Sequence, residues 1–230
     1  MKTNKRYEVL LLDADGTLLD FDRAEAESFK AVLKKYGFPQ TETLAEEYHK
    51  INKECWEAFE EGKIDRETVL TSRFERFFKG HGLTVDGREA ENYYRSFLGR
   101  GFYLIDGALE ICSYLKKRYA LYIVTNGVAD TQHIRLRESG LEPYFKDVFI
   151  SEEAGSQKPK KEFFDYCFAR IPGAEPEKML LIGDSLTSDM RGGVNAGVDT
   201  CWYNPSRRKN DKGVCVTYEI QDLIQLEELL

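Results

Sequence analysis

Short apolar runs that end abruptly in polar residues are the feature that most constrains the fold of this chain. Runs of this length, bounded by turn residues, are typical of buried β-strands. Five of them occur: 9–12, 121–124, 148–150, 179–182 and 198–203. Helix-like segments alternate with them: 107–118, 130–139, 160–170 and 187–196. This alternation predicts an α/β fold with a parallel sheet, in which ligands bind beyond the carboxyl ends of the strands. A short strand at 214–217 and a closing helix at 219–230 complete the expected elements.

The segment from about residue 23 to residue 100 breaks this alternation, because it contains no convincing strand. Its apolar residues recur at helical spacing, which predicts four or five amphipathic helices. Turns that contain glycine or proline separate these helices. We therefore expect a helical domain inserted into an α/β core, with the following boundaries: residues 1–20 and 101–230 for the core, and residues 21–100 for the insert.

The charge and the hydropathy pattern argue against two classes of partner. Lysine and arginine total 33, against 40 aspartate and glutamate residues, which gives a formal net charge of −7. An acidic chain lacks the basic face that a nucleic-acid polymer requires. No apolar run approaches the ~20 residues of a membrane helix, and the polar N-terminus lacks the apolar segment of a secretory signal. We expect a cytoplasmic protein that binds neither a nucleic-acid polymer nor a membrane, and its oligomeric state is left open.

The cysteines are typical of reduced thiols rather than of a disulfide framework or a zinc site. Their number is odd, they are widely scattered, and no pair forms a C-x-x-C motif. Free cysteines usually behave as small buried apolar side chains. We expect such burial for Cys55, Cys112, Cys167, Cys201 and Cys215.

Two acidic pairs follow apolar runs and are candidates for a metal site. Asp13 and Asp15 follow the first run, and Asp184 and Asp189 follow the run at 179–182. Two unit charges ~4 Å apart repel by roughly 4 kcal/mol at an effective dielectric constant near 20, so a converged cluster needs a cation. Oxygen ligands without histidine or cysteine favour Mg²⁺ over Zn²⁺. The alternatives are an ordinary turn for the first pair and helix capping for the second.

Two further segments could hold an anion at the same edge of the sheet. Thr125 and Asn126 end the middle run, where a hydroxyl group and loop amides can bind phosphate oxygens. Lys158 comes 33 residues after Thr125, between a strand and a helix, and could neutralise both a phosphate and the aspartates. A common strand-ending turn and a solvated basic turn remain the respective alternatives.

The order of these segments closely resembles the haloacid dehalogenase superfamily. The chain contains D-x-D-G-T, then a hydroxyl residue after an apolar strand, then Lys-Pro, and finally G-D-S-L-T-S-D. The resemblance covers essentially the whole chain. It implies a Rossmann-like core with a cap domain inserted just after the first motif, where the helical stretch lies. It also implies a Mg²⁺-dependent phosphohydrolase.

The resemblance also implies roles for individual residues. Asp13 would be the nucleophile that forms an aspartyl-phosphate, and Asp15 would be the general acid and then the general base. Thr125 and Asn126 would hold the phosphate group. Lys158 would stabilise the nucleophile and the developing charge. Neutralisation of this kind is needed before a carboxylate can approach a phosphate dianion.

The ligands of the Mg²⁺ ion are implied in the same way. They would be the Asp13 carboxylate, the main-chain carbonyl of Asp15 and the Asp184 carboxylate. Asp189 would support either the metal shell or Lys158. The expected substrate is therefore a small-molecule phosphomonoester.

The inserted segment resembles the cap of the pyrimidine 5′-nucleotidase branch of this superfamily. The resemblance lies in residues 52–63 and 73–74, and in the D-F-D of residues 20–22. Trp56 or Phe59 would then stack on a base, or both would be core residues of the cap. The expected activity is a 5′-nucleotidase, and the alternative is a phosphatase for phosphoglycolate or a sugar phosphate.

Reactions of other classes fit the sequence less well. The dehalogenase branch usually lacks the second aspartate of the first motif, and a phosphomutase would need a sugar-phosphate pocket. A G-D-S-L serine esterase would use Ser185, but it requires a downstream histidine, and all three histidines lie upstream. A catalytically inert binding module is a further alternative. The basic run at residues 206–210 receives no role.

Overall fold

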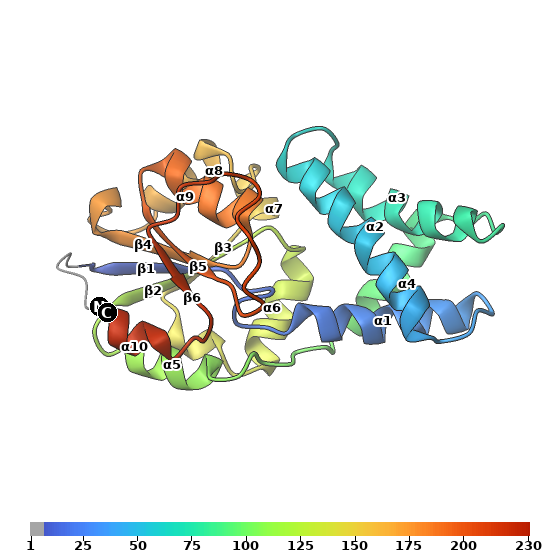
Figure 1. The fold of residues 1–230 in the computed structure, drawn as a ribbon, viewed down its shortest axis with the longest axis horizontal. Coiled ribbons are helices and arrows are strands. Elements are labelled where there is room, and N and C mark those ends of the chain that lie inside the picture. The colour runs from blue at the N-terminus through green and yellow to red at the C-terminus, as the bar shows by residue number, and fades with distance from the viewer. Residues whose placement is uncertain (1–6) are drawn as a thin grey trace. The chain divides into compact units, whose positions relative to one another are not determined.

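The structure is a computed structural model that describes residues 7–230. The described chain forms two compact units: a helical unit, Phe21–Tyr103, and an α/β unit that contains the remainder. Figure 1 shows the elements of each unit. Within the described residues, no helix has both the length and the apolar character that crossing a bilayer would require.

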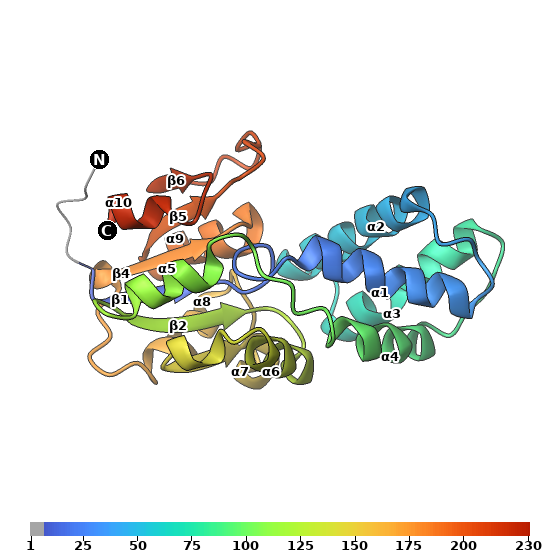
Figure 2. The same cartoon turned by 90° about the horizontal axis from the view of Figure 1, so that it is seen from below.

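The α/β unit is built on one six-stranded parallel sheet with the order β3-β2-β1-β4-β5-β6, most of which can be followed in Figure 2. The predicted α/β parallel sheet is therefore confirmed. Its strands are β1 (Val9–Leu12), β2 (Ala120–Thr125), β3 (Asp147–Ile150), β4 (Met179–Gly183), β5 (Asp199–Tyr203) and β6 (Tyr218–Ile220). Leu12 of β1 pairs with both Ile123 and Ile182, so the carboxyl ends of β1, β2 and β4 lie at one edge.

Helices cover both faces of the sheet, which explains why the strands are apolar throughout. In β1, Leu10 and Leu12 pack into one core cluster, while Val9 and Leu11 pack into the other. Figure 1 shows α5 and α10 on one side of the sheet and α8 and α9 on the other. The helices of this unit are α5 (Ala108–Leu115), α6 (Ala129–Glu138), α7 (Ser151–Ala154), α8 (Lys161–Phe168), α9 (Arg191–Ala196) and α10 (Gln225–Leu229), with 3₁₀ turns at Glu142–Tyr144 and Pro176–Lys178.

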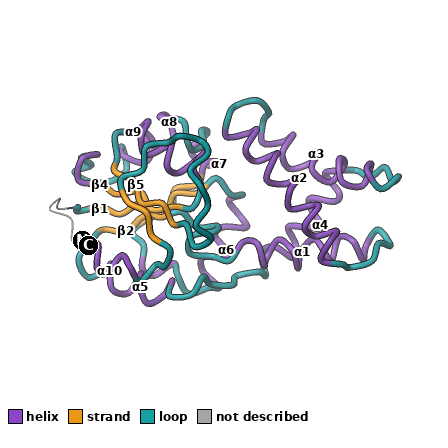
Figure 3. Tube along the Cα trace, in the orientation of Figure 1, coloured by secondary structure: helices purple, strands orange, loops and turns teal. Residues whose placement is uncertain are grey.

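The helical unit consists of four helices and their loops (Figure 3). They are α1 (Phe21–Lys35), α2 (Glu42–Glu60), α3 (Arg66–Gly80) and α4 (Gly87–Leu98). The side chains of Thr41, Asp65 and Asp86 accept a hydrogen bond from the backbone N–H three residues on, and so cap α2, α3 and α4. Aromatic rings fill the centre of the unit, where Phe29 stacks on Tyr48 with ring centroids 3.8 Å apart.

The last strand lies later in the chain than expected. The prediction of a strand at 214–217 is wrong: Tyr218–Ile220 forms β6 instead, and the closing helix is shortened to α10. Apolar residues alternate from position 214 to position 220, so the pattern does not specify which part pairs with β5. Thr217 exchanges two side-chain hydrogen bonds with Thr200, and pairing begins only at Tyr218, opposite Cys201.

Two further expectations hold only in part. The helix expected at 187–196 divides into a π-helical turn, Leu186–Met190, and α9, because the N–H of Met190 bonds to the carbonyl of Ser185 five residues earlier. All five cysteines are free thiols, but Cys215 is exposed because it lies in the loop before β6, while the other four are buried.

Candidate active site

A buried lysine joins two aspartates at the carboxyl edge of the sheet. The ammonium group of Lys158 donates to Asp13 Oδ1 at 2.6 Å, to Asp189 Oδ1 at 2.6 Å and to the Val124 carbonyl at 2.8 Å. Three acceptors match the three donors of an ammonium group. The Lys158 side chain is only 1% exposed. It is therefore not part of a solvated basic turn.

Asn126 holds the backbone of that lysine. Its side-chain nitrogen donates to the Lys158 carbonyl at 3.0 Å, and its side-chain oxygen accepts from the Lys158 N–H at 2.9 Å. The Thr125-Asn126 turn after β2 therefore positions the loop between α7 and α8. Both polar atoms of the Asn126 side chain thus bond to the Lys158 backbone, whereas the sequence suggested that Asn126 holds a phosphate.

Three carboxylates converge beside the ammonium group. One oxygen from each of Asp13, Asp184 and Asp189 lies within 4.8 Å of the others. Asp184 comes close to the first motif because Gly16 has no side chain. A Cβ atom at Gly16 would lie 2.9 Å from Asp184 Cγ, and the residue has φ +79°, a conformation that favours glycine.

The electrostatics of this cluster favour a bound cation. Burial raises the pKa of the Asp13 carboxyl well above its usual range; Lys158 lowers this pKa, while Asp189 and Asp184 raise it further. Burial by itself lowers the pKa of the Lys158 ammonium group, but Asp13 and Asp189 outweigh this effect and raise the pKa above its usual value. Three carboxylates thus face the buried Lys158 ammonium and the exposed Arg208 guanidinium, whose Nη2 lies 3.7 Å from Asp184 Oδ2. Negative charge remains in excess, and a divalent ion would compensate it.

Asp189 and Ser185 have local structural roles. Asp189 is fully buried; its Oδ1 accepts from Lys158, and its Oδ2 accepts from the Ser185 N–H at 3.1 Å. Ser185, rather than either aspartate, caps the π-helical turn, because its hydroxyl group accepts from the Ser188 N–H at 3.2 Å. The hydroxyl group of Ser185 lies 3.1 Å from that of Thr187 and accepts from the Ser188 N–H, so its partners are not histidines, which argues against an esterase triad built on Ser185.

The Thr125 hydroxyl group is oriented by two donors. It accepts from the Gly127 N–H at 3.1 Å and from Gln132 Nε2 at 2.7 Å. A hydroxyl group accepts two hydrogen bonds and donates one. With both acceptor positions used, the proton of Thr125 is available to an oxygen of a ligand.

Asp15 is bound by two residues that the sequence analysis did not identify. Arg135 Nη1 donates to Asp15 Oδ1, and Gln132 Nε2 donates to Asp15 Oδ2 at 2.7 Å. Both residues lie on α6, whose polar composition resembles a solvated surface. The helix in fact buries Arg135 completely, while its neighbour Ile134 is 39% exposed. A polar i, i+3 pair just after the Thr-Asn-Gly turn is the only signal that could have identified them.

The basic run also contacts the candidate site. Arg208 Nη2 donates to the Asp184 carbonyl at 2.8 Å, and Trp202 Nε1 donates to the same carbonyl at 2.9 Å. The buried Asn204 side chain holds this loop by bonding to both the N–H and the carbonyl of Arg208. Arg208 therefore supports the backbone of Asp184 and also lies 3.7 Å from its Oδ2, although its sequence context suggested only a solvated loop.

Trp56 and Phe59 lie on α2 of the helical unit. The Trp56 ring is half-buried and contacts Phe59 edge-on, with ring centroids 5.8 Å apart. Phe59 is a core residue that packs with Cys55 and Val69. Of the two alternatives, a core role therefore fits Phe59, whereas Trp56 keeps part of its ring exposed.

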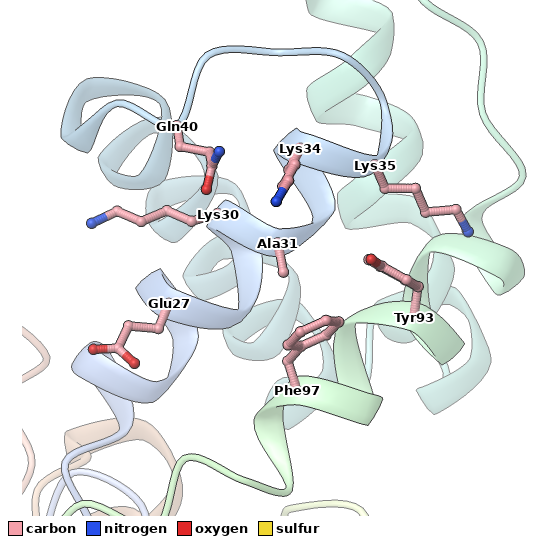
Figure 4. Close-up of a pocket in the computed structure, with 8 residues that line it drawn as sticks. All are labelled: Glu27, Lys30, Ala31, Lys34, Lys35, Gln40, Tyr93 and Phe97. Atoms are coloured by element: carbon pink, nitrogen blue, oxygen red, sulfur yellow. The ribbon is translucent and has the colours of Figure 1, made fainter.

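The helical unit also has an open pocket of about 550 Å³ (Figure 4). It is formed by α1, α4 and the loop after α1, and its lining residues are Glu27, Lys30, Ala31, Lys34, Lys35, Gln40, Tyr93 and Phe97. Two of its lysines are paired, Lys30 with Glu42 and Lys35 with Glu89. The pocket contains no carboxylate cluster comparable to the one around Asp13.

Comparisons with known proteins agree with the geometry of the α/β unit. Residues 7–197 match the family model of haloacid dehalogenase-like hydrolases. HAD-hydrolase YfnB of Bacillus subtilis (strain 168) is 48% identical over 226 residues, which cover 98% of this chain and 96% of that protein. A crystal structure of YfnB described as bound to magnesium matches with a TM-score of 0.93, over 97% of this chain and 98% of that one.

Two similar proteins have names that state an activity. Pyrimidine 5′-nucleotidase PynA of Streptococcus pneumoniae is 40% identical over 222 residues, covering 95% of this chain and 94% of that protein. Pyrimidine 5′-nucleotidase YjjG of Escherichia coli is 29% identical over 225 residues, covering 98% of each. The resemblance found from the order of the motifs is confirmed.

Proposed function

The chain belongs to the haloacid dehalogenase-like hydrolase family, and on that premise we propose that it is a Mg²⁺-dependent phosphatase of pyrimidine nucleoside 5′-monophosphates. One observation carries the proposal: the buried ammonium group of Lys158 joins Asp13 to Asp189, beside the carboxylate of Asp184. The nucleotide class rests on the similarity, over nearly the whole chain, to proteins named pyrimidine 5′-nucleotidases.

The residues present fit a Mg²⁺ ion. All three side chains in the cluster offer carboxylate oxygens, the donors that this hard cation prefers. Asp13, Asp184 and the main-chain carbonyl of Asp15 would hold the ion, while Asp189 would act through Lys158. When bound, Mg²⁺ supplies the positive charge that allows a carboxylate to approach a phosphate dianion.

Asp13 is the proposed nucleophile. One of its oxygens attacks phosphorus while the bond between phosphorus and the ester oxygen breaks, which gives an aspartyl-phosphate. Lys158 binds Asp13 Oδ1 and so fixes the orientation of the carboxylate. Thr125 donates its free hydroxyl proton to a phosphate oxygen.

Asp15 is the proposed acid and base. As a carboxylic acid it gives its proton to the leaving ester oxygen. As a carboxylate it then takes a proton from the water molecule that attacks the aspartyl-phosphate. This second step releases inorganic phosphate and restores the Asp13 carboxylate.

A substrate panel tests both parts of the proposal. UMP, TMP, phosphoglycolate and sugar phosphates are assayed with Mg²⁺, with EDTA, and with EDTA followed by excess Mg²⁺. We expect kcat/KM for UMP or TMP to exceed the other values by at least about tenfold, and EDTA to abolish turnover reversibly. Preference for phosphoglycolate or a sugar phosphate would refute the nucleotide part, and chelator-resistant hydrolysis would refute the metal part. A folded protein without turnover of any phosphomonoester would favour an inert binding module.

A further inference from the structure

We propose that Gln132 and Arg135 are positioning residues that fix Asp15 relative to the phosphate-binding Thr125, an inference that rests on the proposed function. Both lie on α6, one turn apart, and their side-chain polar groups converge on the Asp15 carboxylate. Gln132 also contacts Thr125. Side chains of a single helix thereby bind both Asp15, the proposed acid and base, and Thr125, the proposed phosphate ligand.

The pair binds Asp15 through both of its oxygens. Arg135 is fully buried and Gln132 is 1% exposed, while the Asp15 side chain is 24% exposed. A buried guanidinium group is costly unless an anion accompanies it. Because the two donors engage different oxygens, they restrict both the position and the rotation of the carboxylate.

Gln132 links Asp15 to Thr125 directly. Its Nε2 lies 2.7 Å from Asp15 Oδ2 and 2.7 Å from Thr125 Oγ1. One amide group therefore sets the spacing between the proposed acid and the hydroxyl group that would hold the phosphate. An ion pair that served stability alone would not require this second bond.

Gly127 leaves the space that Gln132 occupies. A Cβ atom at Gly127 would lie 2.5 Å from Gln132 Nε2 and 2.7 Å from Gln132 Cδ. The Thr-Asn-Gly turn and the polar face of α6 therefore form one matched arrangement. Replacing Gly127 with alanine offers a way to displace Gln132 without removing any polar group.

The expected consequence is a defect that depends on the leaving group. General acid catalysis matters most when a poor leaving group departs, and it contributes typically 10²–10⁴-fold. UMP loses an alkoxide, whereas p-nitrophenyl phosphate loses a far more stable phenolate. If Arg135 and Gln132 position the acid, their loss slows the hydrolysis of UMP more than that of p-nitrophenyl phosphate.

The experiment measures kcat and KM for both substrates in Arg135→Met, Arg135→Lys, Gln132→Met and Gly127→Ala. We expect kcat/KM for UMP, which reports the steps up to release of the leaving group, to fall about 100-fold in Arg135→Met and Gln132→Met, as a displacement near 1 Å can produce. Hydrolysis of the aspartyl-phosphate is common to both substrates and affects kcat alone. For p-nitrophenyl phosphate we expect kcat/KM to fall by less than about tenfold. Arg135→Lys, which keeps the charge, should recover part of the loss. Arg137→Met is the matched control on the same helix, because Arg137 is exposed and pairs only locally with Glu138; we expect wild-type kinetics.

A double-mutant cycle with Asp15→Asn separates positioning from stability. If Arg135 acts through Asp15, adding Arg135→Met to Asp15→Asn causes no further loss of kcat/KM for UMP. Equal losses of kcat/KM for both substrates, or a full additional loss of kcat/KM in the double variant, would overturn the inference. If thermal unfolding shows that Arg135→Met does not fold, the same double-mutant cycle is measured with Gln132→Met and tests the inference in its place. If Asp15→Asn itself lowers kcat/KM equally for the two substrates, the acid role in the proposed function fails, which is a different result.

Discussion

Replacing Lys158 with methionine should destabilise the protein and slow catalysis, because it removes the only cation that contacts Asp13 and Asp189 among the described residues. The carboxylate oxygens in the cluster lie within 4.8 Å of one another. At an effective dielectric constant near 20, two charges at that distance repel by about 3 kcal/mol. Breaking a buried pair by removing one partner costs about 3–5 kcal/mol. We therefore expect the free energy of unfolding to fall by about 4 kcal/mol without Mg²⁺.

Urea unfolding followed by circular dichroism, with and without excess Mg²⁺, measures this change. Excess Mg²⁺ should recover part of the loss, because a divalent ion compensates the same carboxylates. A barrier raised by about 3 kcal/mol corresponds to a loss of at least about 100-fold in kcat for UMP. Lys161→Met is the control, since Lys161 is 63% exposed and its ion pair with Asp165 lies on the surface. A Lys158→Met protein that is as stable as wild type and keeps a tenth of its activity would refute the reasoning.

Three further predictions follow from the same contacts. Asp13→Asn should abolish turnover without unfolding the protein. Acid quenching of the wild type during turnover, followed by borohydride reduction, should convert phosphorylated Asp13 to homoserine, which mass spectrometry detects; an unreduced Asp13 would contradict the nucleophilic role. Gly16→Ala should weaken Mg²⁺ binding in calorimetry and reduce activity, because its Cβ atom would lie 2.9 Å from Asp184 Cγ; wild-type affinity would show that the close approach is unnecessary. The hydrogen bond that the protonated His49 ring donates from Nδ1 to the Glu25 carboxylate raises the pKa of His49 in spite of burial, so this pair stabilises the folded state fully below about pH 6.5. That stabilisation is lost as pH rises through the raised folded-state pKa, and His49→Gln should flatten this part of the stability profile in urea titrations.

The strands show how much local sequence specifies. Val9–Leu12 is apolar at every position because helices cover both faces of the sheet, and the run ends where the chain leaves the core at Asp13. Such a run can be recognised without its neighbours. Where a pattern extends beyond the element, as the alternation from 214 to 220 does, only pairing with β5 selects Tyr218–Ile220.

The polar residues of the candidate site divide in the same way. Asp13, Asp184 and Lys158 each follow an apolar run or precede a helix, so their positions indicated that they would meet at one edge of the sheet. Gln132 and Arg135 lie in a polar helix that looks solvated, and apart from their i, i+3 spacing after the Thr-Asn-Gly turn, nothing nearby in the sequence marks them as buried. Their partner Asp15 is 117 and 120 residues away.

From its sequence alone, this chain could be assigned to a parallel α/β fold with a helical insert, and its acidic motifs could be located. Apolar runs, turn residues and the order of motifs are properties of residues that are close in the chain, so they can be recognised locally. Only the tertiary structure decided which buried polar groups bond to which, where the last strand begins, and that Arg135 rather than Ile134 faces the core. These outcomes depend on which helix packs against which strand, because a buried charge is stable only beside a partner that packing brings to it.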